Sequence, residues 1–398
     1  MTTVTLNTGG LRRPTVVHVT TTDMSLDWLL RPQLEAFSAA GFEVIGASAT
    51  GPHVAALEAS GIRHVAIENL TRAMRPGNDA RAYRELVALF RRLRPDIVHT
   101  HNPKPGVLGR LAAWRAGVGA VVNTVHGLYA QPTDGWLRRG VVYGIERAAA
   151  TCSDIELVQN PEDVDTLLRL GLPERKVRLL GNGVDLDRFG PQDLRDDELA
   201  RRRVAIGVDP EAVVCGVVGR LVNEKGYREV LTAAHRLRAT APNLQLVVVG
   251  PTEPDKADAV PADLVDRARR DGVVFLGQRD DVHELYPLFD LYLLASYREG
   301  FPRSAMEAAA CGLPLVVTDI RGGRQVVDHD HTGLLIPAAD ADAIVDAVGA
   351  LALDPGRRRL MGKRSLAKAR AEFDQQHQIN RTLAAYGELL AQTVATSR

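Results

Sequence analysis

Residues 213–226 read VVCGVVGRLVNEKG, a short apolar run followed by a polar turn between two glycines. The run, Val213 to Val218, is too short for an ordinary helix and is rich in valine, which is typical of a buried parallel strand. The turn leads into a helical pattern. A strand that passes through such a turn into a helix is the repeating unit of a doubly wound α/β domain.

Similar apolar runs alternate with helical patterns on both sides of this unit. Those that follow it are Leu244 to Val249, Val273 to Leu276, Leu291 to Ala295 and Leu315 to Val317. Those that precede it are Val16 to Val19, Val44 to Ala47, Ile97 and Val98, Val121 to Val125, Ile155 to Val158 and Val177 to Leu180. A charged, proline-containing stretch, Leu186 to Arg203, separates the two sets. The pattern predicts two Rossmann-like domains in tandem, whose ligands bind in a cleft between the C-terminal edges of their strands.

The length supports this division, because 398 residues exceed what a single core usually fills. The predicted boundaries are residues 1–187 for the first domain and residues 188–374 for the second. Residues 375–398 are expected to form a final helix that packs back on the first domain.

The composition is that of an ordinary soluble globular protein, and its 49 basic and 49 acidic residues give no net attraction to nucleic acid. Three cysteines, Cys152, Cys215 and Cys311, lie far apart, which argues against a disulfide framework and fits a reducing compartment. Residues 1–14 are polar and lack the apolar core of a secretory signal. No apolar run approaches the ~20 residues that span a bilayer. We therefore expect a cytoplasmic protein.

Basic residues crowd the stretch 72–115. The cations are Arg72, Arg75, Arg81, Arg84, Arg91, Arg92, Arg94, Lys104, Arg110 and Arg115, and the acids among them are Asp79, Glu85 and Asp96. This stretch is either a solvated helix face or a basic patch that faces anionic lipid or a phosphorylated acceptor. Its last part, Pro105 to Gly117, has a helical pattern. The apolar stripe of that helix faces either the core or, with Arg110 and Arg115, a lipid surface.

Residues 299–307 read EGFPRSAME and place two carboxylates eight positions apart. They straddle a predicted loop-to-helix junction, because Pro302 suits the first helical position and alanines follow it. The N–H groups of a first helical turn have no internal partners and take an anionic diphosphate well. Glu299 and Glu307 then reach hydroxyls on either side of the phosphates, as a sugar nucleotide requires. The alternative is a solvated helix with two ordinary surface acids.

The turn after Val218 carries two cations, Arg220 and Lys225, ahead of a helix. A fixed guanidinium and a mobile ammonium that converge on one point suit a diphosphate whose charge grows as it leaves. An ordinary charged surface turn is the alternative. The first strand of the chain leads instead into residues 20–25, which lack Gly-x-Gly-x-x-Gly, so NAD binding loses its main support.

These motifs together resemble the retaining GT-B glycosyltransferases of the GT4 family, over nearly the whole chain. The motifs are Gly219-Arg220-Leu221, Glu224-Lys225-Gly226, the two glutamates eight positions apart, Asn182-Gly183-Val184-Asp185 and the run from Ala308 to Pro314. Within that family, His99 to Gly106 and Asn123 to Gly127 are similar to bacterial enzymes that elongate polyprenyl-diphosphate-linked glycans and capsule precursors. The chain departs from many members at Thr20 to Asp23, where they carry a glycine pair that lets the backbone approach the donor phosphate.

The resemblance implies a role for each matching residue. Arg220 and Lys225 would clamp the donor diphosphate, Glu307 would take the ribose hydroxyls, and Glu299 would hold hydroxyls of the transferred sugar. His126 would face the donor sugar across the cleft, unless it is a structural histidine that caps its strand. The remaining donor-binding positions are Gly219, the main-chain groups of Gly300, Phe301 and Ser304, and the base-contacting loop Gly277-Gln278-Arg279. The predicted catalytic set is His126, Arg220, Lys225 and Glu299.

His99 and His101 lie two residues apart on a predicted strand and point to the same face, as a pair of metal ligands would. The sequence near them supplies no carboxylate or cysteine cluster to complete a metal site. The GT4 resemblance implies metal-free chemistry without a cofactor. We therefore expect no metal site.

The function we expect is retaining, metal-independent transfer of a hexose or N-acetylhexosamine from a nucleotide sugar to a saccharide, lipid-linked or small-molecule acceptor. The subgroup resemblance favours a UDP-sugar over GDP-mannose as the donor, and a lipid-linked acceptor would bring the protein to the inner face of the membrane. The motif places no carboxylate as a nucleophile on the opposite face of the sugar, which favours front-side transfer. Two alternatives stay open, a sugar-nucleotide epimerase or hydrolase of GT-B fold and a non-catalytic nucleotide-sugar-binding module. The sequence leaves the donor sugar, the acceptor, the linkage and the oligomeric state open.

Overall fold

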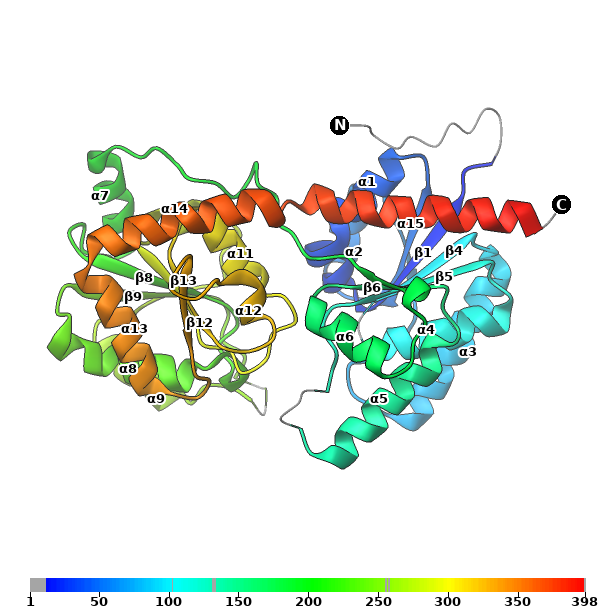
Figure 1. Ribbon diagram of the computed structural model, residues 1–398, viewed down its shortest axis with the longest axis horizontal. Coiled ribbons are helices and arrows are strands. Elements are labelled where there is room, and N and C mark those ends of the chain that lie inside the picture. The colour runs from blue at the N-terminus through cyan, green and yellow to red at the C-terminus, as the bar shows by residue number, and fades with distance from the viewer. Residues whose placement is uncertain (1–11, 102, 131–133, 255, 257, 397–398) are drawn as a thin grey trace. The chain divides into compact units, whose positions relative to one another are not determined.

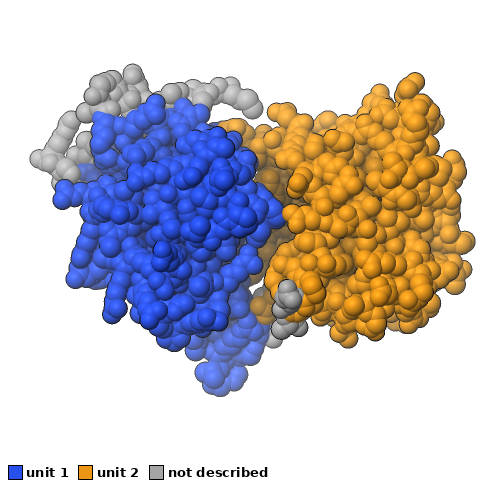
Figure 2. Space-filling view, turned by 180° about the vertical axis from the view of Figure 1, so that it is seen from behind, with its two compact units in different colours: residues 1–181, 377–398 blue, residues 182–376 orange. Residues whose placement is uncertain are grey.

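The computed structural model describes residues 12–396 apart from residues 102, 131–133, 255 and 257. Most of the polar stretch 1–14 and the motif residue Asn102 therefore lie outside the described residues. The chain forms two compact units (Figure 2). Unit 1 contains Met1–Gly181 and His377–Arg398, and unit 2 contains Asn182–Gln376.

Within the described residues, unit 1 is built on a parallel seven-stranded sheet in the order β3-β2-β1-β4-β5-β6-β7. Its strands β1, β4, β5 and β6 are labelled in Figure 1. The strands are β1 Thr15–Thr22, β2 Glu43–Ala49, β3 Arg63–Ala66, β4 Ile97–His101, β5 Ala120–Val125, β6 Ile155–Val158 and β7 Val177–Leu179. The apolar runs predict all of these except β3, a half-exposed edge strand that begins with Arg63 and His64. The strand order reverses between β1 and β4, which is the switch point of the sheet.

Alternate residues of β1 face two different cores, as the two-residue period of a strand requires. Val17 packs with Leu86 of α3 on one face. Val16 packs on the other face with Phe37 of α1 and Tyr386 of α15, so the final helix completes this core. The helices of this unit are η1 Ser25–Leu30, α1 Arg31–Ala39, α2 Val54–Ala59, α3 Pro76–Leu93, α4 Pro103–Ala116, α5 Trp136–Ala150, α6 Pro161–Arg169, η2 Glu174–Lys176 and α15 Gln375–Thr396.

The helix α4 does not offer Arg110 to a lipid surface, so the lipid-facing alternative is wrong for this residue. The Arg110 guanidinium is fully buried and donates to Glu146 and Glu156 at 2.7 Å each. Lys104 is buried too and donates to two backbone carbonyls. The other cations of the stretch are exposed: Arg72, Arg75, Arg81, Arg84, Arg91, Arg92, Arg94 and Arg115. No helix in the described ranges has both the length and the apolar character that crossing a bilayer requires.

Unit 2 has, within its described residues, a parallel six-stranded sheet in the order β10-β9-β8-β11-β12-β13. The strands are β8 Val213–Val218, β9 Leu244–Val249, β10 Val274–Gly277, β11 Leu291–Leu294, β12 Leu315–Thr318 and β13 Gly333–Ile336. The short, glycine-initiated β13 is the strand that the apolar runs do not predict. The helices are α7 Asp196–Ala205, η3 Asn223–Lys225, α8 Tyr227–Thr240, α9 Ala262–Arg270, α10 Val282–Leu285, η4 Tyr286–Leu288, α11 Arg303–Ala310, α12 Gly323–Val326, α13 Ala341–Leu353 and α14 Pro355–Glu372. The strand order reverses between β8 and β11, which marks the expected ligand-binding edge.

The chain passes from one unit to the other twice, after Gly181 and after Gln376. Two backbone hydrogen bonds within unit 2 join the segments next to these points. The Val184 N–H donates to Phe373 O at 2.8 Å, and the Gln375 N–H donates to Val184 O at 3.1 Å. A Cβ added at Gly183 would lie 2.6 Å from the backbone of Gln375, so only glycine allows this approach.

Candidate active site

The predicted donor residues of unit 2 gather where β8 and β11 end, at the switch point of its sheet. Gly219 directly follows β8, and residues 296–300 follow β11. Gly226, at the end of the first loop, has a φ of 72°, and a Cβ added there would lie 2.1 Å from Ala295 O. Glycine therefore lets this loop lie directly against the end of β11.

Lys225 and Glu299 meet across these two loops. The Lys225 ammonium donates to Glu299 Oε1 at 2.5 Å, and Ser296 Oγ donates to the same oxygen at 2.8 Å. Gly322 makes room for this loop, because a Cβ there would lie 2.7 Å from Glu299 O. The structure thus brings two residues of the predicted catalytic set into contact and adds Gly322, which the motifs do not reveal.

Arg220 is held by a different carboxylate. Its Nη1 donates to Glu253 Oε2 at 2.8 Å, and Lys256 Nζ donates to the same oxygen at 2.5 Å. Partial desolvation opposes ionisation of Glu253, but the hydrogen bonds from Lys256 and Arg220 outweigh it and lower the pKa of that carboxyl. Glu253 and Lys256 carry no motif signal. Only their position in the loop after β9 brings them to this edge of the sheet.

Glu307 is a mostly buried carboxylate in α11, with partners on both oxygens. The Tyr286 hydroxyl lies 2.9 Å from Oε2, and Arg303 Nε donates to Oε1 at 3.2 Å. Burial raises the pKa of Glu307, while Arg303 and the Tyr286 hydroxyl oppose that shift. Ser304, in the first turn of the same helix, accepts from the Tyr292 hydroxyl at 2.7 Å. Tyr286 therefore orients Glu307, and Tyr292 orients Ser304, which are the two predicted donor-binding side chains of α11.

The other predicted donor positions lie in neighbouring loops. Gly277 ends β10 with a φ of 68°. Two residues later, Arg279 Nε donates to Asp281 Oδ1 at 2.7 Å, so that the arginine side chain is already engaged. Phe301 O accepts from Asn182 Nδ2 at 3.1 Å. Because the Arg279 side chain is engaged, the main chain of the Gly277–Arg279 loop is the part that can contact a nucleotide base.

His126, the remaining predicted catalytic residue, lies in unit 1 just after β5. Its Nε2 is 3.1 Å from His101 Nδ1, and the nearby Gln159 side chain favours the protonated ring. Burial lowers its pKa to about 4, so the ring is neutral at pH 7. It lines a pocket of about 140 Å³ together with Leu128 and Tyr129. The contact with His101 is compatible with the structural alternative, and the catalytic role of His126 stays a prediction.

His18, His99 and His101 form a group of potential metal ligands among the described residues, with ligand atoms within 4.8 Å of one another. Every ring nitrogen of the three has a hydrogen-bond partner in the protein, and the His99 and His101 rings stack with centroids 4.2 Å apart. Burial lowers the pKa of all three. Hydrogen bonding between neutral imidazoles accounts for the cluster, and the absence of a metal site stays a prediction.

Comparisons with known proteins identify the family. Residues 33–188 match the family described as Glycosyltransferase Family 4, and residues 200–368 match Glycosyl transferases group 1. The UDP-Gal:alpha-D-GlcNAc-diphosphoundecaprenol alpha-1,3-galactosyltransferase of Escherichia coli is 30% identical over 292 residues, which cover 72% of this chain and 74% of that one. A D-inositol 3-phosphate glycosyltransferase of Stackebrandtia nassauensis is 33% identical over 323 residues, which cover 76% and 70%. The chain belongs to glycosyltransferase family 4.

Solved structures show the fold of this glycosyltransferase. Anabaena HepE in complex with UDP and glucose aligns with a TM-score of 0.78 and 17% identity, over 94% of this chain and 100% of that one. The predictions of the GT4 family, the GT-B fold and glycosyl transfer are thereby confirmed. The roles of the individual site residues stay predictions.

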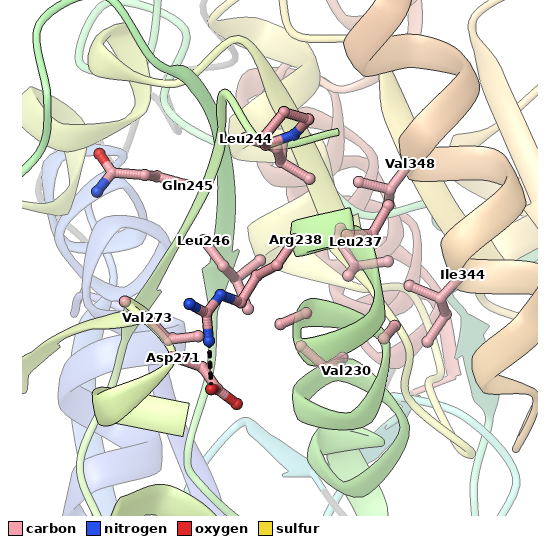
Figure 3. Close-up of a pocket in the computed structure, with 15 residues that line it drawn as sticks. Val230, Leu237, Arg238, Leu244, Gln245, Leu246, Asp271, Val273, Ile344 and Val348 are labelled. Carbon is pink, nitrogen blue, oxygen red and sulfur yellow. Dashed lines mark hydrogen bonds and ion pairs between the residues drawn. The ribbon is translucent and has the colours of Figure 1, made fainter. Parts of the chain in front are cut away.

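Unit 2 of the glycosyltransferase also has a hollow of about 310 Å³ (Figure 3). Val230 of α8, Leu246 of β9 and Ile344 of α13 line it, and Arg238 Nη1 donates to Asp271 Oδ1 at 2.6 Å at its side. No predicted site residue is among the described side chains around it. The hollow includes the first residues of β9, whereas ligands of doubly wound sheets bind beyond the strand C-termini. We therefore do not assign the donor to it.

Proposed function

We propose that this glycosyltransferase transfers a hexose or N-acetylhexosamine from a UDP-sugar, with retention of the anomeric configuration and without a metal ion. The observation that carries the proposal is the Lys225–Glu299 ion pair at the switch point of unit 2. When a cation and a carboxylate lie side by side, the cation can bind a phosphate and the carboxylate can accept a hydrogen bond from a sugar hydroxyl. Support for the donor comes from the Escherichia coli relative, which is named for UDP-Gal, and from HepE, which was solved with UDP and glucose.

Donor binding requires the ion pairs of the site to exchange partners. Lys225 turns from Glu299 to an oxygen of the diphosphate, and Arg220 turns from Glu253 to the same group. Both cations gain an acceptor of higher charge, and hydrogen bonds between ionised groups are the stronger kind. Glu299 is then released to accept hydrogen bonds from the sugar. Glu307, which is already oriented by the protein, accepts from the ribose.

The chemistry that fits this site is front-side transfer. The acceptor hydroxyl oxygen bonds to the anomeric carbon on the face from which the diphosphate departs. The bond between that carbon and the diphosphate oxygen breaks, its electron pair stays on UDP, and the acceptor proton passes to a diphosphate oxygen. Arg220 and Lys225 stabilise the negative charge that grows on the leaving group, as a metal ion does in other sites. No cofactor is needed for these steps.

For the acceptor, we propose a saccharide carried on a polyprenyl diphosphate, reached by peripheral contact with the cytoplasmic face of the membrane. The name of the Escherichia coli relative includes an acceptor of this kind. The helix α5 supplies a surface for such contact, because four of its large apolar side chains are between 48% and 80% exposed. They are Trp136, Leu137, Val141 and Ile145. Arg138 and Arg147, exposed on the same helix, suit anionic headgroups.

The experiment that tests the function measures UDP release from UDP-hexoses and UDP-N-acetylhexosamines in the presence of a metal chelator. Each donor is assayed without acceptor, with a polyprenyl-diphosphate-linked saccharide and with soluble saccharides or inositol phosphate. We expect release that requires an acceptor, and a product whose anomeric configuration matches that of the donor. Equal donor consumption without acceptor would favour the hydrolase or epimerase. Donor binding without turnover would favour the binding module.

A further inference from the structure

Glu299 is held by two hydrogen-bond donors, one charged and one neutral. Lys225 Nζ and Ser296 Oγ both donate to its Oε1, at 2.5 Å and 2.8 Å. Ser296 is fully buried, and its carbonyl accepts from Thr318 Oγ1 at the end of the neighbouring strand β12, at 2.6 Å. The serine hydroxyl is therefore a fixed partner of the carboxylate, whereas the Lys225 side chain is long and partly exposed.

Glu253 has the same arrangement with a different second partner. Arg220 Nη1 and Lys256 Nζ both donate to its Oε2, at 2.8 Å and 2.5 Å. Lys256 lies in the same turn, because its N–H donates to Glu253 O at 3.1 Å. The loop that contains this turn is joined to the loop of Arg220, since the Leu221 N–H donates to Pro251 O at 2.9 Å. The second partner here is a cation, which compensates the charge of Glu253 even without Arg220.

Binding of a diphosphate by the donor-site cations, Arg220 and Lys225, leaves two carboxylates behind. A carboxylate that loses its sole partner must be solvated again or must move, and an uncompensated anion beside the diphosphate would repel it. A second hydrogen-bond donor on the same oxygen lets each carboxylate keep its place while the cation turns to the nucleotide. Both partners of Glu299 share Oε1, so Oε2 is left for a sugar hydroxyl.

We propose that Ser296 and Lys256 are positioning residues: each holds its carboxylate in place while the diphosphate takes the donor-site cation from it. The inference rests on the proposed function, because it requires a diphosphate that binds both cations. The charge that remains after the exchange differs between the two places. Lys256 leaves a neutral pair beside the diphosphate, so it acts on nucleotide binding. Ser296 leaves an oriented anion, so it acts on sugar transfer.

The first test measures binding of UDP to Lys256→Met by isothermal titration calorimetry. This variant leaves Glu253 as an unpaired anion once Arg220 has turned away. UDP should therefore bind about 5-fold more weakly, which is the upper range for one partly exposed ion pair. Lys368→Met is the matched control, because Lys368 pairs with Asp328 in the turn that leads into β13, on the side of the strand N-termini. Its affinity for UDP should equal that of the wild type.

A direct contact between Lys256 and the diphosphate would weaken UDP binding too. The double variant Glu253→Gln/Lys256→Met separates the two causes, because it removes the carboxylate that Lys256 is proposed to hold. In the Glu253→Gln background, Lys256→Met should change the affinity for UDP by less than about 2-fold. Weaker binding that persists in this background, or wild-type affinity in Lys256→Met alone, would overturn the positioning role of Lys256.

The second test measures transfer by Ser296→Ala at saturating UDP-sugar and acceptor. Turnover should fall about 10-fold, the scale of one hydrogen bond to a charged group, while the affinity for UDP stays close to wild type. In Glu299→Ala, which lacks the carboxylate, the same serine substitution should cause no further loss. Ser365→Ala is the control, because Ser365 is also buried and its hydroxyl has no hydrogen-bond partner within the described residues. Equal losses with and without Glu299 would show that Ser296 has a packing role only.

Binding of UDP also separates these outcomes from the proposed function. Arg220→Ala should weaken UDP binding, because Arg220 is proposed to contact the diphosphate. If this variant bound UDP as tightly as the wild type, the exchange of partners would be wrong, and the positioning roles with it. If it bound UDP more weakly while Lys256→Met and Ser296→Ala matched the wild type in binding and turnover, the positioning roles alone would be rejected.

Discussion

The two donor-site cations, Arg220 and Lys225, are the residues proposed to stabilise the leaving group. Arg220→Ala and Lys225→Ala each remove a charge that is proposed to meet the departing diphosphate, so turnover at saturating donor should fall by about 100-fold or more. Arg238→Ala is the matched control, because this arginine pairs with Asp271 beside the hollow of unit 2 and should leave turnover unchanged. Turnover close to wild type in either donor-site variant would remove that residue from the role.

The two glutamates should separate nucleotide binding from sugar transfer. Glu307→Ala should weaken binding of both UDP and UDP-sugar, because its proposed partner is the ribose. Glu299→Ala should spare UDP and mainly impair transfer, because its proposed partner is the sugar. Isothermal titration calorimetry with UDP measures the contrast. Equal UDP affinity in the wild type and both variants would exclude the ribose role of Glu307.

The sequence predicts residues at this site where a local pattern places them, and misses those that the fold alone brings in. Glu307 is predicted by its spacing from a helix start, and Arg220 by the turn after a strand. Glu253 and Gly322 belong to loops without a motif, and they reach the site because β9 and β12 end at the same edge of the sheet as β8 and β11. Which carboxylates pair with Arg220 and Lys225 also depends on how these loops converge at one edge of the sheet, and the spacing of residues in the sequence does not reveal it.

The position of the loop between β8 and α8 depends on one close contact, that of Gly226 with Ala295. Gly226→Ala should lower the free energy of unfolding by more than the ~1–3 kcal/mol of a strained backbone conformation, because its Cβ would also meet Ala295 O. Gly207→Ala is the control: Gly207 has a similar φ of 80°, and nothing lies within 4 Å of an added Cβ. Urea unfolding compares the two variants. Equal losses of stability would mean that the loop can move away from β11.

A further prediction concerns lipid binding by the exposed apolar face of α5. The purified chain should bind anionic liposomes, and the binding should weaken as salt screens the arginines. Replacing Leu137 and Val141 together by serine should reduce liposome binding while UDP affinity stays unchanged. Leu360→Ser is the control, because Leu360 is about as exposed but lies on α14 of unit 2. Sedimentation with liposomes measures all three proteins. Unchanged binding in the double variant would exclude α5 as the contact surface.

Strands can be predicted from the sequence where burial of both faces makes a run of residues uniformly apolar. The valine-rich central strands follow from their apolar runs, because both of their faces are covered. The polar edge strand β3 and the short β13 lack that signal. The helix α4 shows a different limit, since an apolar stripe beside arginines looks the same whether it faces lipid or the core. Only the positions of Glu146 and Glu156 place Arg110 inside.

The clustered histidines should make the stability of unit 1 sensitive to acid. Burial holds their pKa values below the ordinary 6.5, at about 4 for His126 and about 3 for His18, so the unfolded chain binds more protons as the pH falls. Their stabilising effect is complete above pH 6.5 and is lost as the pH falls from 6.5 towards the folded values. Each such histidine costs up to about 1.4 kcal/mol of stability per pH unit in that window.

Local probes can assign this loss to unit 1. The three tryptophans, Trp28, Trp114 and Trp136, belong to unit 1, whereas the buried Cys215 and Cys311 belong to unit 2. Urea unfolding at pH 7.5 and pH 5.5 should show a larger fall of the midpoint by tryptophan fluorescence than by labelling of these two thiols. Equal shifts by both probes would mean that the histidines of unit 1 do not cause the acid sensitivity.

The division of the chain into units also determines the order in which the parts of each unit are synthesised. Unit 2 is one continuous segment, whereas unit 1 needs His377–Arg398, which are made after all of unit 2. While the ribosome is still translating, the face of the first sheet that α15 covers stays open. Phe37 and Phe42 then lack the Tyr386 ring that packs against both in the finished protein. Unit 1, which contains the N-terminus, can therefore be completed only after all of unit 2 has been made, unlike an N-terminal domain that folds first. A chain that ends before α15 would contain all but the last residues of unit 2, attached to an incomplete unit 1.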